Sequence, residues 1–418
     1  MEGETTLSPV SNWAGNVRFH AVRRHRPTSV AELRDLVGAA TAVRVLGTGH
    51  SFNAIADTDG DLVSVAGLPP EVDIDSDRGT VRVAAGLRYG DVAPRLHAAG
   101  WALPNLASLP HLSIAGAVAT GTHGSGDANG NLATAVVGLD LVLADGSLWA
   151  PPDVGPWVVG LGALGVVTHL TLRLKPTFEI AQYVYDGVPL PSDPAAVDEL
   201  FGAGYSVSLF TRWTSDHGNQ AWVKGPHGGT VPPRWLGGIL ADGPRHPIPG
   251  APAENCTRQQ GIAGPWHERL PHFRPDATPS AGDELQSEYL VPRERAVEAL
   301  AAVDTIRERV SPVLQISELR TVAADELWLS PSYRRDSLAI HFTWVNDAAA
   351  VGPAMAAVEE ALAPLDARPH WGKLFGYGGF RERYERFDDF VALVRQNDPT
   401  GKFRNAWLDR ILGPDTPQ

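Results

Sequence analysis

Two segments in the first third of the chain combine glycines with hydroxyl and imidazole side chains. Residues 44–53 read RVLGTGHSFN, a strand-like run that leads into two glycines and then His50. Residues 105–126 read NLASLPHLSIAGAVATGTHGSG. Glycines let backbone N–H groups converge on an anion, and small residues let the backbone lie against a large flat ligand. The pattern predicts a ligand with phosphates. The simpler alternatives are a strand-ending turn with a surface histidine and a flexible Gly/Ser loop.

Two later segments, residues 314–321 and 338–345, alternate like strands with polar side chains on one face. In the second segment the opposite face carries four large apolar side chains. A polar pocket and an ordinary solvent-facing sheet both fit this alternation. The chemistry-bearing side chains are Glu318, Arg320, His341 and Thr343.

A lysine follows these strands at a point where the chain could return to its first part. Lys373 ends the run His-Trp-Gly-Lys and is one of only four lysines in the chain. A cation can stabilise negative charge on a reacting group, and a desolvated lysine can act as a base. The alternative is a loop lysine in water, against which the rarity of lysine argues mildly.

Charge and cysteine content exclude several other functions. The chain has 418 residues and 35 lysines and arginines against 48 acidic residues, a formal net charge of −13. Such an acidic protein repels phosphate backbones, so we expect no nucleic-acid partner. The single cysteine, Cys256, excludes an internal disulfide and any cysteine-rich metal site.

Other catalytic motifs are absent from the sequence. The histidines of the run from His267 to His272 are spaced one residue too far apart for a zinc HExxH site, and Pro271 would break its helix. No GxSxG elbow or P-loop occurs. We therefore expect no metal site. Most remaining histidines, including His217, His227 and His246, are interpreted as surface residues.

The chain also lacks the sequence features of a targeted or membrane protein. Its first residues are acidic and precede no apolar run, and no stretch approaches the roughly 18 apolar residues of a membrane span. We expect a cytoplasmic protein with no membrane partner.

The order of the predicted elements indicates an α+β fold. A capping box at Ser29 opens a helix to about Ala39, another helix follows near residues 89–99, and an Asp-Gly turn at 145–146 predicts a hairpin. Later helices are predicted at 292–310, 347–362 and 388–397. Strands are predicted at 42–46, 62–65, 80–84, 135–143, 182–188, 206–213 and 220–224, with a further half-buried strand carrying Leu170, Leu172 and Leu174.

Together, VLGTGHSFN and LPHLSIAGAVATGTHGSG resemble the FAD-binding domain of the vanillyl-alcohol oxidase family of flavoproteins. The resemblance is closest to its alditol (xylitol, sorbitol) oxidases, and it continues through LQSEYLVPRE, ARPHWGK and DPTGKF over nearly the whole chain. It implies a two-domain α+β flavoprotein, with an FAD-binding domain over 1–176, a substrate domain with an antiparallel sheet flanked by helices over 177–372, and a C-terminal return to the FAD-binding domain over 373–418.

The resemblance also implies roles for particular residues. It implies a covalent bond between the His50 ring and the flavin 8α-methyl group, which would fix the cofactor and raise its potential. Arg320 and Lys373 would engage the reacting oxygen of the polyol, with His341 tuning them, while Ser108, Glu318 and Thr343 would bind neighbouring hydroxyls. The expected FAD-lining residues are Val45, Leu46, Gly47, Thr48, Gly49, Ser51, Ser108, Ser113, Gly116, Ala117, Val118, Ala119, Thr120 and Val166.

We therefore expect an FAD-dependent oxidase that converts the terminal primary alcohol of linear polyols to the aldose while oxygen is reduced to hydrogen peroxide. The nearest alternative is a related flavoenzyme that acts on a sugar lactone or another alcohol, with an acceptor other than oxygen. A non-catalytic carbohydrate- or nucleotide-binding protein on a flavin scaffold is the alternative from another class. The preferred polyol and the oligomeric state are not predicted.

Overall fold

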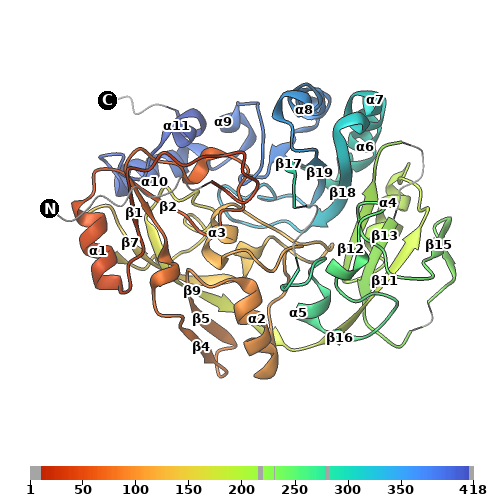
Figure 1. Cartoon of the computed structure of the whole chain (residues 1–418), viewed down its shortest axis with the longest axis horizontal. Coiled ribbons are helices and arrows are strands. Elements are labelled where there is room, and N and C mark those ends of the chain that lie inside the picture. Colours follow the sequence, from red (N-terminus) through yellow and green to blue (C-terminus); the bar gives the residue numbers. More distant parts are fainter. Residues whose placement is uncertain (1–10, 215–219, 230, 278–281, 414–418) are drawn as a thin grey trace.

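The computed structural model describes residues 11–214, 220–229, 231–277 and 282–413. Strands of the first part build a three-stranded parallel sheet, β1-β3-β2, and a five-stranded antiparallel sheet, β4-β5-β9-β7-β8 (Figure 1). The elements are β1 (Arg23–His25), α1 (Val30–Ala39), β2 (Val43–Val45), β3 (Asp61–Val63), β4 (Val72–Asp75), β5 (Thr80–Ala84), α2 (Tyr89–Ala98), β6 (Trp101–Ala102), α3 (Ile114–Ala119), β7 (Val136–Val142), β8 (Leu148–Trp149), β9 (Val166–Arg173) and β10 (Lys175–Pro176).

The rest of the chain builds a ten-stranded sheet in the order β14-β15-β11-β13-β12-β18-β19-β17-β20, with β16 paired to β11. Its elements are β11 (Glu179–Asp186), α4 (Pro194–Phe201), β12 (Ser206–Thr211), β13 (Gln220–Gly225), β14 (Arg234–Trp235), β15 (Gly238–Leu240), β16 (Gly264–Pro265), α5 (Trp266–Arg269), β17 (Leu285–Pro292), α6 (Ala296–Thr305), α7 (Arg307–Val310), β18 (Leu314–Val322), β19 (Ser337–Trp344), α8 (Ala348–Leu362) and β20 (Arg368–Pro369). The helices α9 (Phe380–Arg383), α10 (Phe387–Asn397) and α11 (Ala406–Leu412) follow.

The structure confirms the predicted α+β class, with an antiparallel sheet flanked by helices. Helix α1 starts after Ser29, whose side chain accepts a hydrogen bond from the N–H of Glu32. The Asp-Gly turn joins β7 to β8 as an antiparallel hairpin, and Gly146 has a φ of 83°, which favours glycine. The predicted helix over 292–310 is wrong at its start and near its end, because Pro292 ends β17 and Ile306 separates α6 from α7.

The central strands of the ten-stranded sheet carry large apolar side chains on one face and a group of polar side chains on the other. Leu338, Ile340, Phe342 and Trp344 of β19 are fully buried on the apolar face. Tyr289 of β17 is paired with Ile340 and donates a hydrogen bond to Glu359 of α8, so helices cover this face. Figure 1 shows α6, α7 and α8 together along this side. The polar face is left to line the site described below.

Helix α8 and the residues that follow it are rich in apolar side chains. Ala348–Leu365, which includes α8, is long enough and apolar enough to cross a membrane, with a mean hydropathy of 1.2 over 18 residues. The sequence analysis did not identify this window. Core helices of soluble proteins pass the same test, and α8 packs against α6, α7 and β17, so the finding is weak evidence for a membrane span.

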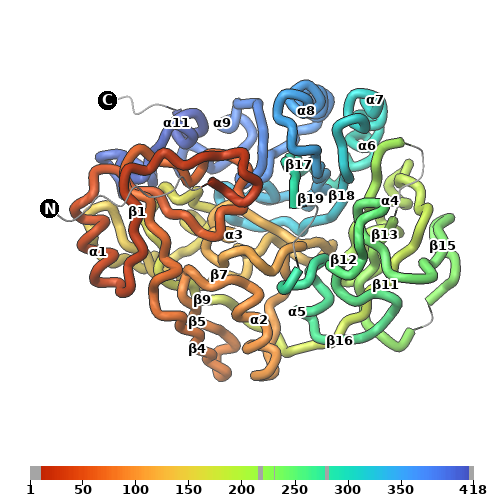
Figure 2. The backbone as a smooth tube through the Cα atoms, viewed as in Figure 1, coloured from red at the N-terminus to blue at the C-terminus, as the bar shows by residue number. Residues whose placement is uncertain are grey.

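The C-terminal segment packs against the N-terminal part of the chain, where Figure 2 draws blue beside red. The N–H of Val43 donates to the carbonyl of Lys402, and the Arg44 guanidinium donates to the carbonyl of Phe403. The buried Lys402 ammonium donates to the carbonyls of Val37, Gly38 and Ala144. These bonds show how the DPTGKF segment is held against the N-terminal part of the chain. The division of the chain into domains at residues 176 and 372 stays a prediction.

Candidate active site

A large cavity lies between the two glycine-rich segments and the polar face of the ten-stranded sheet. The structure places almost all residues predicted to contact the cofactor on its wall. Those that line it are Val45, Leu46, Gly47, Thr48, Gly49, His50, Ser51, Ser108, Ser113, Gly116, Ala117, Ala119 and Thr120. Val118 and Val166 do not line the cavity but are buried in the core, and Gly165 and Val167 line it next to Val166.

Close backbone packing shapes the wall beside the glycines. A Cβ atom added to Gly47 or Gly116 would collide with the Oγ of Ser113, so a larger residue at either position would force the Ser113 side chain to move. Gly49 has a φ of 72°, a conformation that side-chain-bearing residues rarely adopt. The start of α3 thereby lies directly against the turn after β2. This cradle of small residues and hydroxyls fits the phosphates of a dinucleotide cofactor.

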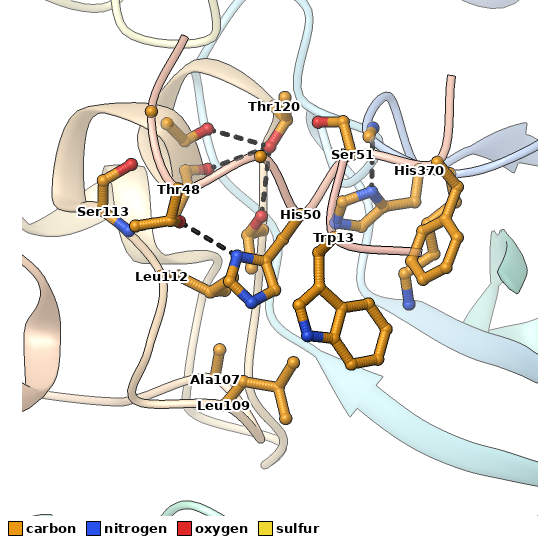
Figure 3. A pocket seen from close by; sticks show the side chains of 18 of the residues that line it. Trp13, Thr48, His50, Ser51, Ala107, Leu109, Leu112, Ser113, Thr120 and His370 are labelled. Carbon is orange, nitrogen blue, oxygen red and sulfur yellow. Dashed lines mark hydrogen bonds between the residues drawn. The ribbon is translucent and has the colours of Figure 1, made fainter. Parts of the chain in front are cut away.

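His50 projects into this cavity as a neutral imidazole. Its Nδ1 lies 3.0 Å from the Oγ1 of Thr48, and its ring stacks on Trp13 at 5.6 Å between centroids (Figure 3). The Thr48 Oγ1 also accepts the N–H of Ser113, which ties this contact to the start of α3. Burial, helped by the charge of His111, lowers the pKa of His50 to about 4. The ring is therefore unprotonated and nucleophilic at neutral pH.

The polar face of the sheet confirms the predicted strand parity. Glu318 of β18 is paired with His341 of β19, which is paired in turn with Glu288 of β17, so the three form a row across neighbouring strands. These three residues are at most 7% exposed, which excludes an ordinary solvent-facing sheet. Arg320 and Thr343 extend this face along the same strands.

Glu288 joins the two cations of the site. Its Oε1 accepts from Arg320 Nη2 at 2.6 Å and its Oε2 accepts from Lys373 Nζ at 2.6 Å. His123 Nε2 lies 3.3 Å from the same carboxylate. The coulombic effect of Lys373, then of Arg320 and His123, outweighs burial and keeps the pKa of Glu288 well below its ordinary value. A fully buried carboxylate thus stays ionised and fixes both cations.

Lys373 continues the network to a hydroxyl on the cavity wall. Its ammonium lies 2.8 Å from His341 Nδ1, and His341 Nε2 lies 3.1 Å from Thr343 Oγ1. An ammonium only donates, so His341 accepts at Nδ1 and carries its hydrogen on Nε2. Burial, then the charge of Lys373, keeps the pKa of His341 well below its ordinary value. His341 therefore donates to Thr343, whose own hydrogen is free for a ligand.

Two contacts bring this network to the glycine segments. The Asn53 amide donates to the carbonyls of Trp371 and Lys373, which fixes the Lys373 loop beside the turn that carries His50. Arg320 Nη1 donates to Ser108 Oγ at 3.3 Å. All six residues predicted to act on the substrate line the same cavity: Ser108, Glu318, Arg320, His341, Thr343 and Lys373.

Sequence reasoning missed several residues of this wall. Glu288 and Gln286 lie on β17, a strand that the sequence analysis did not predict, although a lone charge in the apolar run LQSEYLV was a usable signal. The description of His246 as a surface residue is wrong, since it is 5% exposed. His217 lies outside the described residues. Other cavity residues to which the sequence analysis gave no role in the site are Trp13, His123, His272 and His370, although the three histidines lie in segments that it quotes.

The fold and the site define a flavin-dependent oxidoreductase, in which a glycine-lined cofactor cradle meets a buried polar substrate wall. A sequence profile of FAD-binding domains matches residues 24–150, and a profile of D-arabinono-1,4-lactone oxidase matches residues 283–411. The chain is 52% identical to an alditol oxidase of Streptomyces sp., over 96% of this chain and 99% of that protein. It belongs to the vanillyl-alcohol oxidase family of flavoproteins, among its alditol oxidases.

More distant relatives share the same architecture. An L-gulono-1,4-lactone dehydrogenase of Mycobacterium tuberculosis is 30% identical over 98% of this chain and 100% of that protein. The crystal structure of a cholesterol oxidase from B. sterolicum superposes with a TM-score of 0.76 at 15% identity, over 97% of this chain and 96% of that chain. This likeness shows the fold.

Proposed function

We propose that this protein oxidises the terminal primary alcohol of linear polyols, such as xylitol and sorbitol, at a bound FAD with oxygen as the acceptor. In balance, R–CH2OH and O2 become R–CHO and H2O2. One observation carries the proposal: a buried row of charged and hydroxyl groups faces the same cavity as His50. An alcohol with several hydroxyls can satisfy such a wall, whereas an apolar ligand would leave buried polar groups without partners.

The bound FAD supplies an acceptor for the hydride of the alcohol carbon and passes the two electrons to oxygen. The segments 45–51 and 113–120 hold its phosphates through backbone and hydroxyl groups. Arg320 and Lys373 donate hydrogen bonds to the reacting oxygen, which gains negative charge as its hydrogen leaves. Glu318, Ser108 and Thr343 bind the neighbouring hydroxyls, and Glu318 does so as an acceptor because it is ionised.

We further infer that the cofactor is joined covalently to His50. The support is a neutral imidazole that faces the cavity and is oriented by Thr48 and Trp13. Joining a ring nitrogen to the 8α-carbon replaces an N–H and a C–H bond by a C–N bond. Two electrons and two protons therefore leave, and oxygen accepts them as hydrogen peroxide. His50 would thereby hold the flavin in the cavity that the imidazole faces.

Two measurements test these proposals separately. Acid precipitation of the purified protein should leave the yellow colour in the pellet, while release of all colour to the supernatant would refute covalent attachment alone. Anaerobic addition of xylitol should bleach the flavin, and air should restore the colour with one peroxide per aldose formed. Bleaching by a sugar lactone but not by polyols would favour the lactone alternative. Polyol binding without bleaching would favour a non-catalytic protein.

A further inference from the structure

A second buried lysine–histidine pair lies next to Glu318, on the β12–β13 side of the sheet. Lys224 of β13 is 1% exposed and His272, in the loop after α5, is 4% exposed. Lys224 Nζ lies 3.0 Å from His272 Nδ1, and His272 Nε2 lies 2.7 Å from Glu318 Oε1. His272 lines the cavity, whereas Lys224 lies behind it. Neither residue has a role in the polyol oxidation described above.

The partners of Lys224 determine where each hydrogen lies. Burial lowers the pKa of Lys224 to about 7, so at pH 6.5 the side chain is mainly an ammonium, which also donates to the carbonyls of Leu270 at 2.5 Å and Pro271 at 3.3 Å. Two of its hydrogens are used there, because carbonyl oxygens only accept, and the third points to His272 Nδ1. His272 is neutral, since burial lowers its pKa to about 4, so its one hydrogen is on Nε2. That hydrogen is donated to Glu318.

The rest of the surroundings hold the His272 ring in this orientation. The ring packs edge-on against Phe210 and Trp222, with centroids 5.5 and 5.3 Å away. Its backbone N–H donates to the carbonyl of Ser108 at 3.0 Å, which ties the loop to the predicted substrate-binding segment. The imidazole therefore has little freedom to turn away from Glu318.

We propose that Lys224 and His272 form a positioning pair that orients the Glu318 carboxylate and keeps it a pure hydrogen-bond acceptor toward the substrate. The inference rests on the proposed role of Glu318 in polyol binding. Neither residue of the pair need touch the substrate. His272 occupies one lone pair of Glu318 Oε1. The remaining lone pairs of the carboxylate face the ligand, so a ligand hydroxyl that binds there must be the donor.

The pair mirrors Lys373 and His341, with the opposite result. There the same lysine-to-imidazole order ends on Thr343 and leaves a hydroxyl hydrogen for the ligand. The cavity wall thereby offers an acceptor at Glu318 and a donor at Thr343. A free hydroxyl can donate to one and accept from the other, whereas a ring ether or carbonyl oxygen can only accept. The two pairs together therefore suit a ligand that places a free hydroxyl between Glu318 and Thr343.

The test uses the FAD-loaded enzyme at pH 6.5 with xylitol. His272→Phe keeps a planar ring but removes the donor, and it should raise KM by roughly 10- to 100-fold with kcat changed little. His272→Gln, which keeps an N–H near the position of Nε2, should stay within about fivefold of the wild-type KM. In a Glu318→Ala background, His272→Phe should change KM less than about threefold, because its partner is already absent.

A matched control separates positioning from general stability. Lys402 is a buried lysine that donates to three carbonyls away from the site, so Lys402→Met should lower thermal stability without changing KM. Lys224→Met should raise KM, and it carries the test if His272→Phe does not fold.

The outcomes discriminate between the two proposals. Unchanged KM in Glu318→Ala would refute the proposed role of Glu318 itself. If Glu318→Ala does raise KM, two results would overturn the positioning pair. One is a wild-type KM in both His272→Phe and Lys224→Met. The other is an equal effect of His272→Phe on KM in the wild-type and the Glu318→Ala enzymes.

Discussion

Replacing Glu288 by glutamine perturbs the most connected charge in the site. The substitution keeps the size of the side chain but removes the anion that Lys373 and Arg320 share, each at 2.6 Å. Both cations are buried in the cavity wall and would have to keep their charge without a partner. Removing one partner of a buried ion pair typically destabilises a protein by about 3–5 kcal/mol. We expect a loss of this size in the free energy of unfolding, together with a loss of activity.

The expected kinetic effect follows from the same contacts. If about 3 kcal/mol of cation placement is lost in the transition state, kcat/KM for xylitol falls roughly 150-fold. The pKa of Lys373 is lowered mainly by burial, and Glu288 opposes this shift. Without Glu288 the ammonium loses that support, so its pKa falls further. The alkaline limb of the kcat/KM profile should therefore move to lower pH in Glu288→Gln.

Glu359 provides a matched control. It lies on α8, which packs against the opposite face of β17. It is a largely buried carboxylate that accepts from Tyr289 and from the N–H of Gly376, and no ion pair with Lys373 or Arg320 is present in the structure. Glu359→Gln should retain the wild-type pH profile. The assays are urea unfolding and peroxide production between pH 6 and 10. A Glu288→Gln enzyme with wild-type kcat/KM and an unmoved alkaline limb would refute the assignment of Glu288 as the anchor of both cations.

Three further outcomes are expected. Lys373→Ala and Arg320→Ala should each lower polyol turnover by about 100-fold or more with the flavin absorbance retained, and wild-type turnover in both would contradict their role. The pKa values of His50 and His272 are lowered to about 4, so the unfolded chain binds protons that the folded chain does not bind as the pH falls from 6.5 to 4. Urea unfolding should therefore show a lower free energy of unfolding at pH 5 than at pH 7, and the difference should be smaller in His272→Phe. Ser29→Ala should cost about 1 kcal/mol of unfolding free energy without changing kcat/KM, and an unchanged free energy of unfolding would contradict the role of Ser29 as the cap of α1.

Strand alternation predicted the substrate wall well because it depends only on local geometry. Once residues 314–321 form a strand, Glu318 and Arg320 must lie on the same face of it. In the same way, a strand over 338–345 places His341 on the face opposite its large apolar side chains. Alternation cannot say which strands are neighbours, so the pairing of Glu318 with His341 came only from the fold. The same limit applies to Glu288, whose importance lies in partners that are 32 and 85 positions away in the sequence.

Residue rarity was a weaker guide than it looked. Lys373 was proposed as a site residue partly because it is one of four lysines. Lys224 and Lys402 are buried too, and both donate to backbone carbonyls. Only the distances to Glu288 and His341 distinguish the catalytic candidate from the other two. Histidines misled in the opposite direction, since His246 is buried although its sequence neighbourhood is a proline-rich loop. The cytoplasmic location stays a prediction, because no structural feature bears on it.

The charges around the cavity explain why the polar wall suits oxidation of an alcohol rather than binding alone. Lys373 and Arg320 lie close to two ionised carboxylates, Glu288 and Glu318. Burial lowers the pKa of Lys224, behind His272, to about 7, so this lysine adds a third cation at pH 6.5. Burial keeps His272, His341 and His370 neutral, because it lowers the pKa of each. Below the pKa of Lys224, cations therefore outnumber carboxylates in this group. Stable binding of a neutral polyol gains nothing from such an imbalance, whereas an oxygen that loses its proton during hydride loss is stabilised by it.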